Sequence, residues 1–365
     1  MSKSEKTIFI SDLSEGREIS APFFINSLGR GRTNRGGVYL NVELSDKSGR
    51  LAAKVWDGAE TLAPRLAEGT VAMVRGYVDS YRGSLQLVIR DAEPLPKEAI
   101  NWPDYLKTSP RPLAEMKVEL WDMVNSMADN DFRRLTSAAL AHREVGDKYY
   151  NFPAAKSLHH AYLHGLLEHS LSVAMMARKA GEHYPGLNPD LLLAGALMHD
   201  LGKIWEFSPP PGSDYSTLGR LKGHLVMGCE FLGRVATEME SFPTEKLTLL
   251  QHLILSHHGE PEFGAPVRPQ LLEAIVLHHL DNIDAKLEAV GSFIENSAGD
   301  DGWSDYHRLF GGHYMRTLHL EPGAAEEAEP EKPIEPERNS ETEDAAGSGD
   351  EAGDALNSDN DRLLF

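Results

Sequence analysis

The spacing of hydrophobic residues changes from a period of two to a helical period near residue 100. Apolar and polar side chains alternate over residues 38–44 and again over residues 51–56, as in half-buried strands. Over residues 113–124, apolar residues recur every three or four positions, as on the buried face of a helix. We therefore expect a multidomain chain, with an all-β domain followed by an all-α domain.

The N-terminal part contains enough strands for a small barrel. Beyond the two alternating stretches, residues 71–78 and 85–89 flank a polar tip at residues 79–84, which predicts a hairpin. About five short strands in fewer than about 100 residues are typical of an OB-type barrel. We expect this domain at residues 1–95 and a helical connector at residues 96–150.

A second helical block is expected at residues 151–320. Asn188 followed by Pro189 predicts the start of one of its helices. The longest apolar run, residues 191–198, is shorter than the roughly 20 residues that span a bilayer, and the first residues do not resemble a signal peptide. The sequence therefore predicts a cytoplasmic protein without a membrane partner.

The net charge of −20 is concentrated near the C-terminal end. Residues 321–365 hold 15 acidic and three basic residues among Ala, Pro, Gly and Ser, which predicts a disordered acidic tail. Residues 1–95 hold 13 Lys and Arg against 12 Asp and Glu, so the barrel remains free to contact a polyanion. The tail closes on Leu363, Leu364 and Phe365, which fits either a solubilising tail or a docking peptide for a protein partner.

Twelve of the 16 histidines lie between His159 and His279, and residues 1–95 have none. Ligand-type side chains on otherwise apolar helices are costly to bury unless they are paired or bind a cation. Five segments carry them: Glu168-His169, His199-Asp200, His224, His257-His258 and Asp281 with Asp284. Because Cys229 is the single cysteine, imidazole and carboxylate ligands are expected, which favour Mn, Fe, Co or Zn.

His199 and Asp200 stand side by side at the end of a predicted helix, just before Gly202. Adjacent residues differ by about 100° around a helix axis, so both reach one metal cluster only near the helix end at the centre of a bundle. Gly202 is expected to end this helix. Lys203 is expected either to contact a phosphate oxygen or to complement the helix C-terminus.

The ordered set of segments resembles the metal-dependent phosphohydrolase superfamily named HD for its His-Asp pair. More narrowly, PAAKSLHHAYLHGLLEHSLSVA, MHDLGKIWEF and LHHLDNIDAK are similar to the YhaM-type 3′-5′ exoribonucleases. Those enzymes combine an N-terminal OB-fold with an HD domain. The resemblance covers roughly residues 8–312 and leaves the acidic tail outside.

The resemblance implies a centre for one or two divalent ions, with Mn²⁺ expected first. The first ion would be held by His169, His199, Asp200 and Asp281, and a second site would be completed by His224, His257 and His258. Asp200 is expected to bridge the metals and Lys203 to assist catalysis, so that an activated water hydrolyses single-stranded RNA or DNA to nucleoside 5′-monophosphates. His159, His160 and Asp284 are expected to orient ligands or contact substrate.

The barrel is expected to hold a single strand with cations and aromatic side chains. Residues 28–37 are predicted to form a flexible, glycine-rich loop. The predicted nucleic-acid contacts are Arg30, Arg32 and Arg35 in this loop, Tyr39 and Trp56 at polar-phase strand positions, and Tyr81 and Arg82 at the hairpin tip.

Two other functions stay open at this point. One is a nucleotide or cyclic-dinucleotide phosphohydrolase on the same site. Against a cyclic dinucleotide, HHGEPEFGAP lacks the Gly-Tyr-Pro signature of that subgroup. Against a free nucleotide, such a substrate would not need a barrel that binds a strand. The other is a non-catalytic regulator that binds single strands. The sequence also does not decide whether the strand is RNA or DNA, or whether the protein forms a homo-oligomer.

Overall fold

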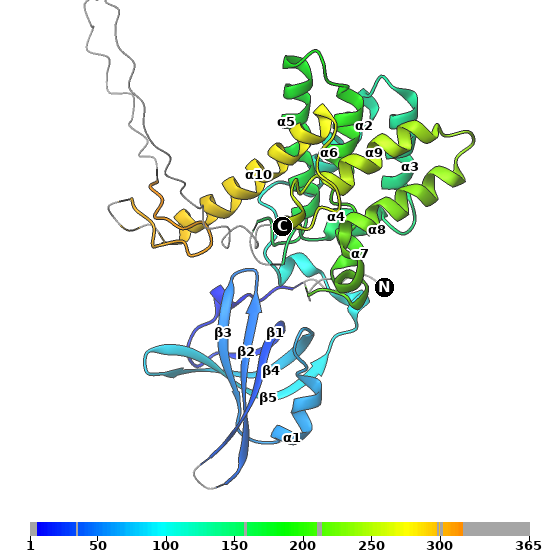
Figure 1. Ribbon diagram of the computed structural model, residues 1–365. Helices are drawn as coiled ribbons and strands as arrows, with labels where there is room; N and C mark the ends of the chain where they lie inside the picture. The colour runs from blue at the N-terminus through cyan, green and yellow to red at the C-terminus, as the bar shows by residue number, and fades with distance from the viewer. Residues whose placement is uncertain are drawn as a thin grey trace, which may run out of the picture. The chain divides into compact units, whose positions relative to one another are not determined.

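The computed structural model describes residues 6–33, 36–156, 159–209, 214–297, 299 and 302–316. The chain divides into two compact units, residues 1–288 and 289–365, and each is considered separately. In the first unit all strands precede the long helices (Figure 1). The predicted change from an all-β to an all-α part near residue 100 is confirmed.

Five strands form a closed barrel in the spatial order β1-β2-β3-β5-β4. They are β1 (Glu18–Arg32), β2 (Val38–Asp46), β3 (Gly49–Val55), β4 (Val71–Tyr81) and β5 (Ser84–Pro94). Strands β3 and β5 pair in parallel, and the other pairs are antiparallel. Leu40, Val42 and Leu44 of β2 are buried in the barrel core, as their alternation predicts. The short helix α1 (Ala59–Leu62) follows β3.

The arginine-bearing segment before β2 is strand and not loop. β1 continues to Arg32 and pairs with β2, with Gly31 opposite Tyr39. A Cβ on Gly31 would lie 2.3 Å from Cζ of Tyr39, so glycine leaves room for the tyrosine ring over the strand. The loop prediction was wrong for residues 28–32, because cross-strand pairing outweighs the low strand propensity of glycine. Arg35 lies outside the described residues.

A buried ion pair ties the N-terminal segment to the barrel. Nζ of Lys6 lies 3.3 Å from Oδ2 of Asp46, both side chains are fully buried, and Nζ also donates to the Pro22 carbonyl at 2.5 Å. Burial lowers the pKa of Lys6, although Asp46 opposes this shift. Each charge therefore depends on the other for compensation.

We expect Asp46→Ala to reduce the free energy of unfolding of the barrel by about 3–5 kcal/mol, because the ammonium of Lys6 stays buried without its counter-ion. Urea denaturation of the two proteins measures this. Glu43 lies on β2, as Asp46 does, and forms a solvent-exposed ion pair with Arg50 of β3. Glu43→Ala serves as the control and should change stability by no more than about 1 kcal/mol. Equal stability of Asp46→Ala and wild type would contradict the prediction.

The helical part surrounds one helix, α6 (Pro189–Met198), that is buried over most of its length. Its helices are α2 (Leu113–Ser126), α3 (Asn130–Ala141), α4 (Gly146–Asn151), α5 (Gly165–His183), α6 (Pro189–Met198), α7 (Lys203–Glu206), α8 (Thr217–Glu238), α9 (Thr244–Ser256) and α10 (Leu272–Ser297). Every residue of α6 from Leu191 to Met198 is buried, and α3, α5 and α9 pack against it. The side chain of Asn188 caps α6 by accepting the N–H of Leu191 at 3.1 Å, as the sequence predicts. The end of α6 therefore lies inside the bundle.

The predicted connector contains the short 3₁₀ turns η3 (Lys97–Ala99) and η4 (Trp102–Asp104) and then α2, α3 and α4. In the second unit, isolated β-bridges join Trp303 to Met315 and His307 to Gly312. No helix within the described ranges is long and apolar enough to cross a membrane. The tail predicted to be disordered, residues 321–365, lies outside the described residues.

Candidate metal centre and nucleic-acid interface

Five helical segments bring the predicted metal ligands into one buried cluster. The seven side chains are His169 on α5, His199 and Asp200 after α6, His224 on α8, His257 and His258 after α9, and Asp281 on α10. All seven are buried. Since these segments are far apart in the chain, the packing of the bundle assembles the cluster.

Asp200 lies between two groups of predicted metal ligands. Its Oδ2 lies 3.4 Å from Nε2 of His199 and 3.5 Å from Nε2 of His169. Its Oδ1 lies 3.4 Å from Nε2 of His224 and 3.7 Å from Nε2 of His257. Each carboxylate oxygen of Asp200 thus faces a different group of histidines.

The first group is closed by Asp281. Nε2 of His169 lies 3.0 Å from Oδ1 of Asp281 and 3.1 Å from Nε2 of His199. Burial by itself lowers the pKa of His169, but the carboxylates of Asp281 and Asp284 outweigh it and raise this pKa to about 10. The donor atoms of His169, His199 and Asp281 lie within 4.8 Å of one another, as do those of His224, His257 and His258. Each group is compact enough to hold one metal ion.

The five imidazoles of the cluster are all oriented through Nδ1. Three of these nitrogens meet backbone carbonyl oxygens at 2.8–2.9 Å: Ala196 for His199, Ile254 for His257 and Phe263 for His258. The other two meet carboxylates: Asp284 for His169 at 2.7 Å and Glu206 for His224 at 3.0 Å. Carbonyl and carboxylate oxygens only accept, so Nδ1 carries a proton in each ring, and Nε2 is the nitrogen left to bind a metal.

Several polar atoms at the centre lack hydrogen bonds. In the part of the chain that the structure describes, neither Oδ1 of Asp200, nor Nε2 of His224, nor Nε2 of His257 has a hydrogen-bond partner of acceptable geometry. A buried polar group without a partner costs about 1–3 kcal/mol, and most buried groups have one. Imidazole nitrogen and carboxylate oxygen are transition-metal ligands. The residues present therefore fit a divalent metal.

Lys203 forms an ion pair inside the cluster. It is the first residue of α7, it is buried, and its Nζ lies 2.7 Å from Oδ2 of Asp200. Burial opposes the charge of both groups, but Lys203 and His199 hold the pKa of Asp200 well below its usual range, and Asp200 raises the pKa of Lys203. Both residues stay charged. Neither of the two uses predicted for Lys203 includes this contact.

Gly202 permits close packing and does not end a helix as a left-handed cap. Helix α6 ends at Met198, and Gly202 has right-handed angles, φ −61° and ψ −20°, ahead of α7. A Cβ on Gly202 would lie 2.0 Å from the carbonyl oxygen of His224. The prediction that Gly202 ends the helix was wrong, because periodicity along one segment contains no information about which backbone approaches it. Its missing side chain lets α8 bring His224 to Asp200.

The barrel carries an aromatic pair on β2 and at the end of β3. The ring centroids of Tyr39 and Trp56 are 5.0 Å apart, and Trp56 is 46% exposed. Nζ of Lys54 lies 5.0 Å from the centre of the Tyr39 ring. The exposed ring of Trp56 and the half-buried ring of Tyr39 lie beside a cation, an arrangement that is suited to stacked bases and their phosphates. The β2–β3 face is where OB-folds bind oligonucleotides.

The other predicted nucleic-acid contacts of the barrel lie in two places, near the end of β1 and at the β4–β5 turn. The exposed side chains of Arg30 and Arg32 line a cavity of about 390 Å³ beside Val38. Tyr81 is 60% exposed at the end of β4, and the Arg82 guanidinium carbon lies 5.3 Å from the centre of the Tyr81 ring. The structure thus brings Tyr39 and Trp56 together, while Tyr81 and Arg82 belong to the β4–β5 turn.

Comparison with known proteins agrees with both parts of this geometry. Residues 28–95 match the family model of the OB-fold nucleic acid binding domain, and residues 166–286 match that of the HD domain. The chain is 35% identical over 281 residues to the 3′-5′ exoribonuclease YhaM of Bacillus subtilis (strain 168), which covers 77% of this chain and 88% of that protein. The YhaM of Listeria welshimeri is 33% identical over 309 residues, covering 82% and 98% of the two chains. This chain belongs to the YhaM family.

In this YhaM-family chain the HD-domain match spans all seven cluster residues, while His159 and His160 lie just before it. His159 is buried, its ring centroid lies 5.7 Å from that of His169, and its Nδ1 has no hydrogen-bond partner within the described chain. Burial lowers the pKa of His159 to about 3. The ring centroid of His160 lies 5.5 Å from that of His169, and Nε2 of His160 lies 3.0 Å from Oδ2 of Asp284. The loop before α5 therefore borders the cluster with both histidines.

Sequence reasoning missed three polar residues that support the cluster. Glu206 orients His224, and its other oxygen accepts the backbone N–H of His224 at 3.1 Å. Tyr162 contacts His160, and Ser172 donates to Asp284. A single signal was available for Glu206: it is an acidic residue within the apolar stretch IWEF. Nothing in the sequence pattern distinguishes Tyr162 or Ser172.

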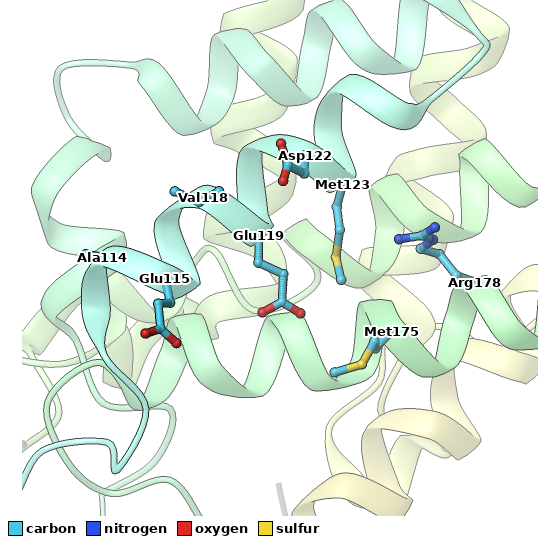
Figure 2. Close-up of a pocket in the computed structure, with 8 residues that line it drawn as sticks. All are labelled: Ala114, Glu115, Val118, Glu119, Asp122, Met123, Met175 and Arg178. Carbon is cyan, nitrogen blue, oxygen red and sulfur yellow. The ribbon is translucent and has the colours of Figure 1, made fainter.

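A separate groove of about 650 Å³ lies between α2 and α5 of this YhaM-family chain. Figure 2 shows Met175 and Arg178 of α5 facing the side chains of α2. The lining also includes Glu115, Glu119 and Asp122. The groove contains none of the predicted site residues, and these three carboxylates make it unsuited to a polyanionic strand.

Proposed function

We propose that this chain is a metal-dependent 3′-5′ exoribonuclease that hydrolyses single-stranded RNA to nucleoside 5′-monophosphates. The observation that carries the proposal is Asp200, whose two oxygens face two groups of inward-turned Nε2 atoms. The similarity to proteins named 3′-5′ exoribonuclease YhaM extends over most of the chain and supports the same reaction.

The metal would be held by the same seven residues that form the cluster. His169, His199, Asp200 and Asp281 would form one site, and His224, His257 and His258 would form the other with Asp200. A divalent metal in such a site supplies a water nucleophile at neutral pH and positive charge beside the phosphate. We propose Mn²⁺ as the ion, with Fe, Co and Zn as alternatives, because the donors are nitrogen and oxygen without thiolate.

The remaining polar groups would bind and orient the end of the strand. Lys203 holds a buried ammonium at the cluster, where it would stabilise negative charge on the phosphate that is attacked. His159 would contact the terminal nucleotide from the loop before α5. Asp284 and Glu206 would fix the imidazoles of His169 and His224, so that no reorientation is needed when the strand arrives.

The barrel would hold the strand on Tyr39, Lys54 and Trp56, with Arg30, Arg32 and the Tyr81–Arg82 turn as additional contacts. These side chains combine the exposed rings of Trp56 and Tyr81 and the half-buried ring of Tyr39 with cations. Stacking on aromatic side chains is tolerant of sequence because every base has a π-face. The barrel is therefore expected to bind single strands of many different base sequences.

Tyr39→Ala and Trp56→Ala should each weaken binding of a long single-stranded RNA roughly 5- to 100-fold, since one stacked base contributes about 1–3 kcal/mol. Fluorescence anisotropy with a labelled 20-nucleotide RNA measures this effect. Cleavage of a dinucleotide, which leaves no further nucleotides for the barrel to bind, should be unchanged. Tyr184→Ala removes another exposed tyrosine, at the end of α5, and is the control. Unchanged affinity of both barrel variants would exclude this stacking site.

The proposed activity is tested with 5′-labelled single-stranded RNA and Mn²⁺. Stepwise shortening from the 3′ end with release of nucleoside 5′-monophosphates is expected. A shifted but intact strand would instead indicate a non-catalytic regulator, and cleavage of free nucleotides alone would indicate a nucleotide phosphohydrolase. Mn²⁺ at about 100 times its Kd should also stabilise the folded protein by about 2.7 kcal/mol. Parallel reactions with DNA determine the preferred strand.

We propose the domain division 1–95, 96–150, 151–320 and 321–365, with activity confined to the third segment and a cytoplasmic location. The acidic segment ending in Leu363, Leu364 and Phe365 would dock a protein partner. Deletion of residues 357–365 followed by pull-down tests this docking, and unchanged partners would leave the segment as a solubilising tail. Sedimentation analysis tests for a homo-oligomer.

A further inference from the structure

His160 has a backbone conformation that is rare for residues other than glycine, with φ of 46°. Its carbonyl oxygen accepts the N–H groups of Ala154 at 3.1 Å and Tyr162 at 2.9 Å. A Cβ on Gly165 would lie 2.0 Å from the same oxygen. The loop therefore forces His160 into this conformation, and strain that is held by so many contacts often accompanies a functional constraint.

Both ring nitrogens of His160 are engaged. Nε2 lies 3.0 Å from Oδ2 of Asp284, and Nδ1 lies 2.8 Å from the hydroxyl of Tyr162, which itself donates to Glu168 at 2.9 Å. Because the tyrosine proton points to Glu168, the hydroxyl oxygen accepts from Nδ1, and the carboxylate of Asp284 accepts from Nε2. The ring is buried. A buried chain of hydrogen bonds thus runs from Glu168 to Asp284.

Asp284 connects this chain to a predicted metal ligand. The same oxygen that accepts from His160 lies 2.7 Å from Nδ1 of His169, and the other oxygen accepts from Ser172. Asp284 is therefore held on three sides, and it fixes both the proton and the ring orientation of His169. Nε2 of His169 then faces Asp281 at 3.0 Å.

We propose that His160 is a positioning residue of the metal centre, which acts on His169 through its hydrogen bond to Asp284. The inference rests on the proposed function, because it requires that His169 binds the metal. It also extends the centre beyond the helices that carry the ligands, since His160 lies before the HD-domain match at residues 166–286. The loop before α5 thereby becomes part of the metal site.

The test is calorimetric titration of full-length, metal-free protein with Mn²⁺. Loss of a group behind a ligating histidine typically weakens metal binding about 10- to 100-fold, and we expect His160→Ala to show about 10-fold. His160→Gln keeps an N–H donor near the position of Nε2 and should retain most of the affinity. His183→Ala, at the exposed end of α5, is the matched control and should bind as wild type.

A second measurement separates positioning from a structural effect. The visible absorption of the Co²⁺-loaded protein depends on the geometry of the ligands, so His160→Ala should change this spectrum while His160→Gln should not. If His160→Ala does not fold, Asp284→Asn replaces it and should weaken Mn²⁺ binding at least as strongly. Wild-type affinity of His160→Ala or Asp284→Asn, or equal losses for Ala and Gln at position 160, would overturn the inference. Absence of Mn²⁺ binding by wild type would instead overturn the proposed function on which it rests.

Discussion

Asp200→Asn is expected to lower kcat/KM for single-stranded RNA by about 10³-fold or more. The substitution keeps the shape of the side chain but replaces one of the two oxygens that face the ligand groups with an amide nitrogen, which cannot bind a metal. Metal catalysis contributes several kcal/mol to stabilisation of the transition state, and each 1.4 kcal/mol is about a factor of ten. Initial rates with Mn²⁺ and 5′-labelled RNA measure the loss.

The same variant should also be less stable, and this effect must be separated from catalysis. Lys203 would remain buried without the carboxylate that now lies 2.7 Å from its Nζ, at a cost of about 3–5 kcal/mol. The double variant Asp200→Asn/Lys203→Met should therefore recover much of the stability and none of the activity. Asp147→Asn, an exposed residue of α4, is the control for both measurements. Mn²⁺-dependent cleavage by folded Asp200→Asn would refute the assignment of Asp200.

Gly202→Ala should reduce both activity and stability, although Gly202 itself carries no functional group. The new Cβ would lie 2.0 Å from the carbonyl oxygen of His224, so α8 must move away from the segment after α6. Overpacking of this kind costs about 1–3 kcal/mol. A shift of about 1 Å in a catalytic group can cost about 10²-fold in rate, and His224 would move away from Asp200.

Urea denaturation and RNA cleavage are measured on Gly202→Ala together with Gly291→Ala. Gly291 lies within α10, and a Cβ there would meet nothing within 4 Å. Alanine is preferred to glycine in a helix by about 1 kcal/mol, so the control should be as stable as wild type or more stable, with full activity. A Gly202→Ala protein that matches wild type in both assays would show that α8 tolerates displacement.

The burial of polar side chains in one centre could be predicted from the sequence because of a conflict within each helix, whereas their assignment as metal ligands came from the resemblance to the HD superfamily. His169 and Asp281 occur on helices with apolar buried faces, where an unpaired polar group is costly. That cost points to a shared partner without any knowledge of the fold. The order of these residues, which resembles that of the HD superfamily, then indicated one buried centre, and about five short strands in the first 95 residues indicated the barrel before it.

Other features depended on contacts between segments that are distant in the chain. The sequence pattern predicted that Lys203 contacts a phosphate oxygen or the C-terminus of a helix, whereas its ammonium lies against Asp200. The pattern also predicted that Gly202 ends a helix, whereas Gly202 packs against the backbone of His224. It placed Arg30 and Arg32 in a loop, whereas pairing with β2 extends the strand to Arg32.

By itself, the sequence determined which side chains must be buried and which chemistry they bring, because hydrophobic periodicity and the cost of buried charge act within each segment. Only the tertiary structure decided how these groups are arranged. The division of the Asp200 oxygens between two ligand groups, the role of Glu206 behind His224 and the chain from His160 to His169 all depend on directed contacts between segments. Distances and directions of this kind are fixed by the packing of helices, which leaves no periodic signal in any one of them.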